Sequence, residues 1–529
     1  ASPVLALGFA LAARLQKTEQ VTLCLLGEGA SNQGMFHEAL NLAAVRSLPV
    51  VFVITNDGTA DATPAEETSR LSNLAQRAVA YGMGNATVDG SDVWGMYRTL
   101  RAAVRVARNS GPTLVEVKVP RLSSLPEGQR DSKDALVRLY QNLVETKSLS
   151  PSDAREIAAA AQLQASRAVE WAQSAPNPPV EALTTFVYSP EPAALYRPAL
   201  LRVATRNLSM AAAVREAQAT ALRTDPAVYL IGVGLASGGR FQTVSGLIDR
   251  YGPERVIDAP ISPNAIIGSA VTAAAAGMRP IIDIGFGDFL TLAADPIVNQ
   301  AAKLRYMTSG QYRAPLVIRV ASGPAQGWGA QHSQSLEGWF AAVPGLLVAV
   351  PSSPYEAKGL LLTAVRSNNP VLFFEPKALY EATGPVPQDD YLVPFGVADV
   401  KRSGTDCTIV AVGAAVGEAL AAAETLAADS ISAEVIDPRT LMPFDWTTVL
   451  ESAGRTGRLV IVEEAPITLG WGAEIAAQAA TYLFGLLRAP IVRVAAAPVP
   501  VPYSPSLAVT ALVGADQVIA AVRRLVREG

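Results

Sequence analysis

The chain has 529 residues, of which 50% are hydrophobic and 17% are charged, and its formal net charge is −4. This length allows three or four domains with large cores, and the slightly acidic balance argues against a nucleic-acid partner. We find no apolar stretch of membrane-span length and no basic flank at the amino terminus, so we expect no membrane contact and a cytoplasmic location.

The first predicted elements form a strand, helix, strand unit with acidic residues at the strand ends. Apolar residues 21–26 and 50–54 predict two buried strands, and residues 32–46 have the periodicity of a helix. A parallel crossover would place Glu28 and Asp57 at the same carboxyl edge of a sheet. Hard oxygen donors at such an edge suit Mg²⁺ or Ca²⁺, which could bridge phosphate oxygens. The alternative is that both side chains only cap loops.

The remaining elements continue this alternation, which predicts an α/β fold with parallel sheets. A strand at 111–119 and a helical tract at 134–173 precede a proline-rich segment, and we place a domain boundary near 190–205. A second unit has predicted strands at 228–233, 280–286, 315–320, 346–350 and 371–374, and helices that include 293–305 and 354–366. After an expected loop at 380–397, a third unit has predicted strands at 407–412, 431–436, 459–462 and 490–494.

Cysteine and histidine are rare in this chain, which makes their positions informative. Cys24 and Cys407 lie in predicted strands, so we expect buried thiols rather than a disulfide or a metal pair. We expect His37, in the first helix, to be a surface residue. His332 follows a glycine-rich run after the strand at 315–320, where catalytic loops belong, so we favour a site role over a structural one.

Motifs in both halves of the chain carry a family resemblance. They are residues 27–34 (GEGASNQG), 56–57 (ND) and 88–92 (VDGSD) in the first half, and 256–262 (VIDAPIS), 331–334 (QHSQ), 368–375 (NNPVLFFE) and 434–443 (EVIDPRTLMP) in the second. With these motifs the chain resembles a fusion of the α and β subunits of the thiamine-diphosphate-dependent, decarboxylating first component of 2-oxo acid dehydrogenase complexes, of the pyruvate or branched-chain type.

The resemblance implies two thiamine-diphosphate-binding-type parallel-sheet domains and a transketolase C-terminal-like α/β domain. The corresponding boundaries are an α-subunit-like diphosphate-type domain at 1–190, a proline-rich linker at 191–205, a β-subunit-like pyrimidine-type domain at 206–390 and the C-terminal-like domain at 391–529. The resemblance also implies a homodimer of fused chains and, as partner, the lipoyl acyltransferase core of a 2-oxo acid dehydrogenase complex or a related dehydrogenase subunit.

The resemblance further implies thiamine diphosphate and Mg²⁺ as cofactors, together with the residues that would serve them. The expected metal ligands are Glu28, Asp57 and Thr59, and the expected catalytic residue is His332. The expected cofactor-binding residues are Gly27, Gly29, Ala30, Asn56, Phe286 and Phe289. For the two phenylalanines the alternative is ordinary core packing. Asp258 and Arg279 match motifs that we expect to orient loops, and we expect Glu463 and Glu464 to form a solvated acidic strand end.

Several positions depart from the family pattern. Glu28 and Asp57 stand where the family has aspartate and asparagine, and Val233 stands where the family has the glutamate that activates the cofactor. Pro263 replaces another glutamate, residues 120–126 replace a histidine-rich loop, and we expect the family's diphosphate-gripping amino-terminal segment to be absent before Ala1.

Two hypotheses follow from these departures. In the first, the chain has impaired or lost thiamine-dependent catalysis and serves an assembly or regulatory role. In the second, it is an active oxidative decarboxylase of pyruvate or branched-chain 2-oxo acids, or a ligase of activated aldehydes, with a rearranged site. Loss of several proton-transfer groups, each worth roughly 10²- to 10⁴-fold in rate, favours the first.

Overall fold

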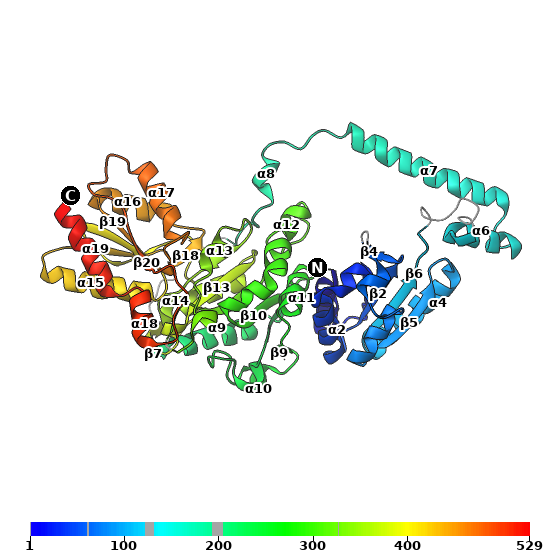
Figure 1. Cartoon of the computed structure of the whole chain (residues 1–529), viewed down its shortest axis with the longest axis horizontal. Coiled ribbons are helices and arrows are strands. Elements are labelled where there is room, and N and C mark those ends of the chain that lie inside the picture. The colour runs from blue at the N-terminus through cyan, green and yellow to red at the C-terminus, as the bar shows by residue number, and fades with distance from the viewer. Residues whose placement is uncertain (1, 61–62, 122–131, 193–204, 326, 529) are drawn as a thin grey trace. The chain divides into compact units, whose positions relative to one another are not determined.

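The computed structural model describes residues 2–60, 63–121, 132–192, 205–325 and 327–528. The chain forms two compact units, Ala1–Phe186 and Val187–Gly529 (Figure 1). Most of the predicted linker, residues 193–204, lies outside the described residues. So does most of the segment that replaces the family's histidine-rich loop, residues 122–126. Each unit is built on parallel sheet, so the predicted α/β class is confirmed.

The amino-terminal unit contains a four-stranded parallel sheet in the order β1-β2-β6-β5. Its strands are β1 (Thr22–Gly27), β2 (Val50–Asn56), β5 (Gly84–Asp89) and β6 (Thr113–Lys118). Both faces of β2 are buried by helices, because Val51 and Val53 pack against α4 while Phe52 packs against Phe36 of α2. A strand that is covered on both sides must be apolar throughout, which explains why residues 50–54 form an unbroken hydrophobic run.

Helices α1, α2 and α4 pack against that sheet, and the unit contains further helices and short elements. Together these elements are α1 (Ser2–Leu15), α2 (Gly34–Val45), α3 (Ala65–Thr68), α4 (Val93–Asn109), α6 (Ala135–Glu145), α7 (Pro151–Ser174) and α8 (Ala182–Thr185), with 3-10 turns at Gly29–Asn32 and Leu74–Tyr81 and a two-stranded ribbon of β3 (Thr59–Ala60) and β4 (Thr63–Pro64). Helix α7 begins with a favourable cap, since Ser150 Oγ accepts the backbone N–H of Asp153 and proline occupies the first turn.

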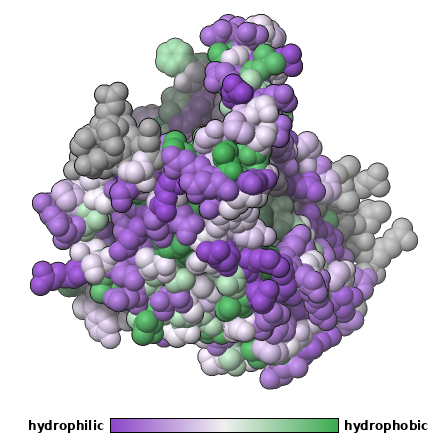
Figure 2. Space-filling view, turned by 90° about the vertical axis from the view of Figure 1, so that its right-hand side faces the viewer, coloured by the Kyte–Doolittle hydropathy of each residue, from purple (hydrophilic) through white to green (hydrophobic). Residues whose placement is uncertain are grey.

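The surface of the molecule is mainly polar on the face shown in Figure 2, where hydrophobic residues lie scattered among hydrophilic ones. Helix α7 has no buried residue, and its apolar side chains, such as Trp171 at 74% exposure, are separated by polar ones. Single exposed apolar residues are common on protein surfaces, so they do not by themselves indicate a docking site.

The carboxy-terminal unit contains a seven-stranded sheet in the order β18-β12-β13-β11-β10-β8-β9. All neighbouring strands are parallel except β18, which is antiparallel to β12. The strands are β8 (Val228–Gly232), β9 (Val256–Asp258), β10 (Arg279–Phe286), β11 (Val317–Ser322), β12 (Leu347–Ala349), β13 (Val371–Pro376) and β18 (Thr440–Met442).

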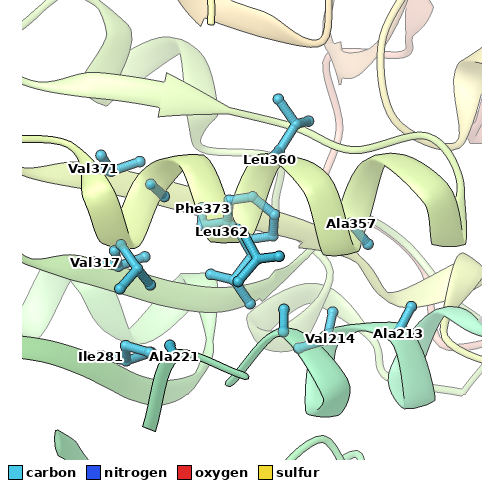
Figure 3. Packing of buried hydrophobic residues seen from close by; sticks show 14 of the residues in the cluster. Ala213, Val214, Ala221, Ile281, Val317, Ala357, Leu360, Leu362, Val371 and Phe373 are labelled. Carbon is cyan, nitrogen blue, oxygen red and sulfur yellow. The ribbon is translucent and has the colours of Figure 1, made fainter. Parts of the chain in front are cut away.

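Two helices that pack against each other cover one face of this sheet. These are α9 (Met210–Thr224) and α14 (Pro354–Arg366). Figure 3 shows residues of their shared core, in which Ala213, Val214 and Ala221 of α9 belong to the same buried cluster as Leu362 of α14 and the strand residue Val317. Small side chains on α9 allow the two helices to approach closely over the strands. The other elements are α10 (Leu247–Tyr251), α11 (Pro263–Ala275), α12 (Leu304–Met307) and α13 (Glu337–Ala341), with short turns at 235–237, 287–293, 330–332 and 377–379.

A second sheet of this unit has the order β15-β17-β16-β19-β20, in which only β15 is antiparallel. Its elements are β15 (Asp399–Arg402), β16 (Cys407–Ala411), α15 (Ala415–Ala428), β17 (Ala433–Asp437), α16 (Trp446–Thr456), β19 (Leu459–Pro466), α17 (Gly472–Tyr482), β20 (Val492–Ala496), α18 (Pro505–Ala511) and α19 (Ala515–Glu528). The two sheets are tied together by β18 and by Glu356 of α14, which is fully buried and pairs with Lys401 and Arg439. The predicted domain division at residue 390 stays a prediction.

Both cysteines are buried and free, as expected from their strand positions. Burial raises the pKa of the Cys24 thiol and of the Cys407 thiol to about 12. At that pKa the reactive thiolate is scarce at neutral pH, so both residues act as small hydrophobes.

Two local predictions were wrong. The expected loop at 380–397 contains β14 (Thr383–Pro387), which pairs antiparallel with β7 (Thr205–Ser209). The helix expected at 293–305 is broken into a π-helical stretch, Pro296–Ala301, and α12. Pro296 has no N–H to donate, so a regular helix cannot run through it without losing a hydrogen bond.

One stretch of the described chain, Pro505–Arg527, is apolar and long enough by composition to cross a membrane, which contradicts our reading of the sequence on this point. It consists of two separate helices, α18 and α19. In α19, Val522 and Leu525 are buried against the second sheet of the unit. This stretch therefore supplies core contacts, and by itself it is weak support for a membrane span.

Candidate functional site

The predicted metal ligands lie at the carboxyl ends of β1 and β2, in the amino-terminal unit. Glu28 follows β1 and is buried, with 6% exposure. Asp57 follows β2, and its Oδ1 accepts the backbone N–H and the hydroxyl of Thr59, each at 3.1 Å. These pairings fix the turn at 57–59 and leave its oxygens in ordered positions. The guanidinium of Arg121 lies 3.5 Å from Asp57 Oδ2 and donates to Thr59 Oγ1 at 2.9 Å.

Asn56 has a structural task in this turn. Its side-chain oxygen accepts the N–H of Gly58 at 3.0 Å, and its amide donates to Glu116 Oε1 at 2.7 Å. Glu116, on β6, is fully buried and also accepts the N–H of Leu74 at 2.8 Å. Sequence patterns could not single out Glu116 as a site residue, because its partners lie 60 and 42 residues away along the chain.

A cavity of about 270 Å³ opens beside these residues. Glu28 and Asn56 line it together with Asn32, Ala65, Glu66, Thr68, Ser69, Arg70, Leu71, Ser72 and Leu74. Arg77 orders its rim, since its guanidinium donates to Ser31 Oγ at 2.7 Å and to Asn32 Oδ1 at 2.8 Å. The cavity is polar on the side of β1 and β2, which suits a charged ligand.

The glycine turn of the first motif is needed for a close approach at one position only. A Cβ on Gly29 would lie 2.9 Å from the Cβ of Ala60, whereas a Cβ on Gly27 would meet nothing within 4 Å. Ala30 lies in the 3-10 turn that follows. Gly29 therefore allows the β3 segment to pack over the turn that carries Glu28.

The oxygens present fit a hard divalent cation. Two carboxylates and the backbone oxygens of the turn at 57–59 are the donors that Mg²⁺ prefers. Among the described residues, no group of three or more His, Cys, Asp or Glu side chains could hold a metal ion. A cation at Glu28 and Asp57 would thus complete its shell with backbone oxygen, water or ligand phosphate, which is how Mg²⁺ is usually held beside phosphates.

The second group of predicted residues forms an aromatic cluster in the carboxy-terminal unit, at the end of β10. His332 packs edge-on against Phe286, with 4.7 Å between ring centroids, and against Phe289 at 5.7 Å. Phe241 joins the cluster, 5.7 Å from Phe286 and stacked on Tyr380 at 4.6 Å. Phe286 is buried, whereas His332 and Phe289 are partly exposed. The cluster is thus partly open to solvent and is not closed core.

Charged groups surround the same ring. The guanidinium carbon of Arg240 lies 5.5 Å from the Phe286 centroid, and Lys377 Nζ lies 5.7 Å from it. Asp288 is buried and holds Gln334, accepting its backbone N–H at 3.3 Å and its side-chain amide at 2.8 Å. Burial lowers the pKa of Lys377 to about 8, although nearby carboxylates, first among them that of Asp288, act in the opposite direction.

A buried ion-pair network lies beneath the aromatic cluster. Arg319, 2% exposed, donates to both oxygens of Glu375 at 2.7 and 2.9 Å and also reaches Asp283 at 3.3 Å. The hydroxyl of Tyr380 donates to Glu375 Oε2 at 2.8 Å. Burial raises the pKa of Glu375, while Arg319 opposes this effect. The network holds Tyr380 in place and so fixes the floor on which Phe241 stacks.

Val233 follows β8 and is 39% exposed. The carboxylate that lies by the same turn is Asp258, whose oxygens accept the backbone N–H groups of Gly234 at 2.7 Å and Ala236 at 3.1 Å. Asp258 thus orients a loop, as we expected. Arg279 does the same elsewhere, donating to the carbonyl oxygens of Val365 and Ser367 at 2.9 and 2.8 Å.

His37 is partly exposed, and its Nδ1 lies 2.8 Å from the Tyr81 hydroxyl while its ring packs edge-on against Phe36. The expectation for Glu463 needs correction. Glu463 is fully buried rather than solvated, and it accepts the N–H of Gly472 at 3.0 Å and pairs with Arg493. Partners distant in sequence supply the polar contacts that permit this burial.

The structure thus groups the predicted site residues in two clusters, one in each unit. Glu28, Asp57, Thr59, Asn56 and the glycine turn lie together in the first, and Phe286, Phe289 and His332 lie together in the second. The assignment of metal, cofactor and catalytic roles to these residues stays a prediction.

Three family models match the chain in this order: "Dehydrogenase E1 component" at residues 1–181, "Transketolase, pyrimidine binding domain" at 206–383 and "Transketolase, C-terminal domain" at 396–518. This combination defines a thiamine-diphosphate-dependent enzyme fold of the transketolase type.

Curated relatives narrow the family. The chain is 42% identical over 336 residues to the acetoin:2,6-dichlorophenolindophenol oxidoreductase subunit beta of Bacillus subtilis (strain 168), covering 61% of this chain and 98% of that protein. It is 41% identical to the 2-oxoisovalerate dehydrogenase subunit beta of the same organism (59% and 97% covered) and 40% identical to the pyruvate dehydrogenase E1 component subunit beta-2, mitochondrial, of Oryza sativa subsp. japonica (61% and 87%). Among solved structures, a "Split gene transketolase, inactive beta4 tetramer" matches with a TM-score of 0.49 and 22% identity, over 61% of this chain and 99% of that chain.

The chain belongs to the 2-oxo acid dehydrogenase E1 family, with an α-like part and a β-like part fused in one polypeptide.

Proposed function

We propose that the chain binds thiamine diphosphate with Mg²⁺ and acts on 2-oxo acids as an E1 component with impaired catalysis. Thiamine diphosphate supplies a nucleophilic carbon in such reactions, while the protein contributes orientation and proton transfer. The impairment would lie in proton transfer, because the groups that orient and bind are retained more fully than those that move protons.

The proposal of impaired catalysis depends on the valine at position 233. Its alkyl side chain cannot accept or donate a proton at the position where the family pattern has an acid. Asp258 is poorly placed to replace that acid, because both of its oxygens already accept backbone N–H groups of the loop. Loss of one general acid or base slows turnover by roughly 10²- to 10⁴-fold.

Binding of the cofactor is supported by the first cluster. Glu28, which lines the cavity of about 270 Å³, and Asp57, which follows the lining residue Asn56, offer hard carboxylate oxygens. In the second cluster, Phe286 and Phe289 would face the aromatic ring of the cofactor, and His332 would hold or move a proton beside them.

The test combines binding with turnover. We expect calorimetry on the full chain to show binding of thiamine diphosphate in the presence of Mg²⁺, and Glu28→Gln to weaken it. We expect slow release of carbon dioxide from pyruvate or a branched-chain 2-oxo acid, and Val233→Glu to speed it by at least about 100-fold. The control is Val397→Glu, which changes a valine of similar exposure, 43%, outside the aromatic cluster.

Each half of the proposal has its own refuting result. A chain that does not bind thiamine diphosphate and Mg²⁺ would refute the binding half. Wild-type turnover in the ordinary range of about 1–10³ s⁻¹, with no gain from Val233→Glu, would refute impairment and support the second hypothesis, an active decarboxylase.

A purely regulatory or assembly role is the other candidate, favoured by the presence of only two histidines in 529 residues. For either role we propose a cytoplasmic homodimer that associates with the lipoyl acyltransferase core of a dehydrogenase complex or with a related dehydrogenase subunit. Sedimentation over a concentration series tests the dimer, since a monomer at every concentration would contradict it.

A further inference from the structure

An arginine, Arg240, lies at the exposed edge of the aromatic cluster. Arg240 is exposed, and its guanidinium carbon lies 5.4 Å from the Trp328 centroid and 5.5 Å from the Phe286 centroid. A cation within about 6 Å of an aromatic face is attracted to it. Two rings therefore hold the guanidinium beside the ring against which His332 packs.

Arg240 has no anionic partner in the part of the chain that the structure describes. None of the ion pairs and hydrogen bonds among these residues involves its guanidinium. By contrast, the guanidinium of Arg319, on β11, is bound by the carboxylates of Glu375 and Asp283. A planar guanidinium with five N–H donors matches a carboxylate well, and here those donors are available to a ligand.

A second cation lies near the same ring. Lys377 Nζ lies 5.7 Å from the Phe286 centroid, and the residue is 6% exposed. Its Nζ is buried and has no hydrogen-bond partner among the described residues. The carboxylates around it are those of Asp288, Glu464 and Glu337. These carboxylates already offset the charge of Lys377, so Arg240 is the cation beside Phe286 that is better placed to attract an anion.

The position of Arg240 bears on which end of a substrate it could bind. A cation held against the carboxylate that is to be lost would stabilise the ground state and slow decarboxylation. A cation at the exposed edge of the cluster, such as Arg240, is better placed to bind a charged group at the far end of the substrate. Resting on the function proposed above, we propose that Arg240 is a specificity residue that selects 2-oxo acids carrying a second carboxylate.

Binding of two probes tests this on the full chain loaded with thiamine diphosphate and Mg²⁺. The probes are 2-oxoglutarate, a dicarboxylate, and 2-oxoisovalerate, a monocarboxylate, and the measurement is their calorimetric dissociation constant. We expect Arg240→Met to weaken 2-oxoglutarate binding about 10- to 100-fold, as for loss of a charge-assisted hydrogen bond, and to leave 2-oxoisovalerate within about threefold. Added salt should weaken the binding of 2-oxoglutarate and leave the binding of 2-oxoisovalerate unchanged.

Matched variants separate this role from general effects. Arg250→Met removes a similar arginine, 5.2 Å from the Tyr251 ring, and should change neither constant. Trp328→Leu keeps the charge of Arg240 but removes one of the two aromatic rings that hold its guanidinium. This variant should weaken the binding of 2-oxoglutarate several-fold. An unchanged unfolding temperature of Arg240→Met is expected, because the side chain is exposed.

The inference is overturned if wild-type chain binds 2-oxoglutarate no more tightly than 2-oxoisovalerate, or if Arg240→Met weakens both probes equally. Cofactor binding, measured first on the same sample, keeps the two proposals apart. Failure to bind thiamine diphosphate refutes the proposed function, whereas normal cofactor binding without discrimination between the probes refutes only the role of Arg240.

Discussion

Removal of Arg319 should destabilise the carboxy-terminal unit strongly. The side chain is 2% exposed and neutralises Glu375, which is fully buried, through two short hydrogen bonds. Arg319→Met preserves much of the volume but leaves Glu375 as an uncompensated buried charge, which costs about 3–5 kcal/mol. For a unit of about 340 residues, with an unfolding entropy of about 2.1 cal/mol/K per residue, this corresponds to a fall in unfolding temperature of about 4–7 °C.

Scanning calorimetry on the full chain measures this effect, and Arg523→Met is the control. Arg523 pairs with Asp429 at 2.7 Å, but both side chains are about 40% exposed, so its loss should cost no more than about 1 kcal/mol. The loss of stability in Arg319→Met should become smaller as the pH falls. The pKa of Glu375 is raised in the folded chain, so the folded chain binds a proton there that the unfolded chain does not, and this proton neutralises the buried charge. Equal effects of the two variants at neutral pH would refute the electrostatic reasoning.

Three further predictions concern stability and reactivity. Burial, and after it the charge of Glu463, raises the pKa of Glu337 to about 7. The folded chain therefore binds this proton more tightly than the unfolded chain, and the resulting stabilisation is lost as the pH rises from about 5 to 7. Over this range the unfolding temperature of Glu337→Gln should fall less than that of wild type, and an identical slope for the two proteins would contradict the prediction. Gly345→Ala should cost about 2–4 kcal/mol in urea titrations, because φ is +99° and an added Cβ would lie 2.1 Å from a backbone oxygen, whereas Gly27→Ala, with open space around it, should stay within about 0.5 kcal/mol. Both buried thiols should resist a thiol reagent in the native chain and react in urea, and fast labelling of the native chain would show that their strands open readily.

The sequence predicted those elements whose signals are local. Helix α14 has the bounds expected from its pattern, because Pro354 opens it and Ser353 caps it, with Ser353 Oγ accepting the N–H of Glu356. Buried strands such as β2, β8, β13 and β16 were also found, since a strand covered on both faces is apolar along its whole length. The three-residue strands β9 and β18 were not predicted. Strand β14 was missed because its two prolines are typical of loops, yet an edge strand tolerates them.

The site was predictable in outline and not in its supporting contacts. The motifs placed Glu28 and Asp57 at one sheet edge, and the structure has both there, with Glu28 lining a cavity. Glu116 and Arg77, which bind the neighbouring residues Asn56 and Ser31, could not be predicted because they lie tens of residues away in sequence. Arg240 was missed for a related reason, since an exposed arginine acquires meaning only from the rings beside it.

The edge strand β18 has a consequence for how this protein can be divided. Thr440–Met442 comes from beyond the pyrimidine-type segment, yet it closes the outer side of that segment's sheet by pairing with β12. A recombinant fragment that stops near residue 390 would leave β12 with a free row of N–H and carbonyl groups, which invites intermolecular strand pairing. Soluble truncation products should therefore extend at least through Met442, and cloning limits drawn from sequence domains alone would cut across a shared ladder.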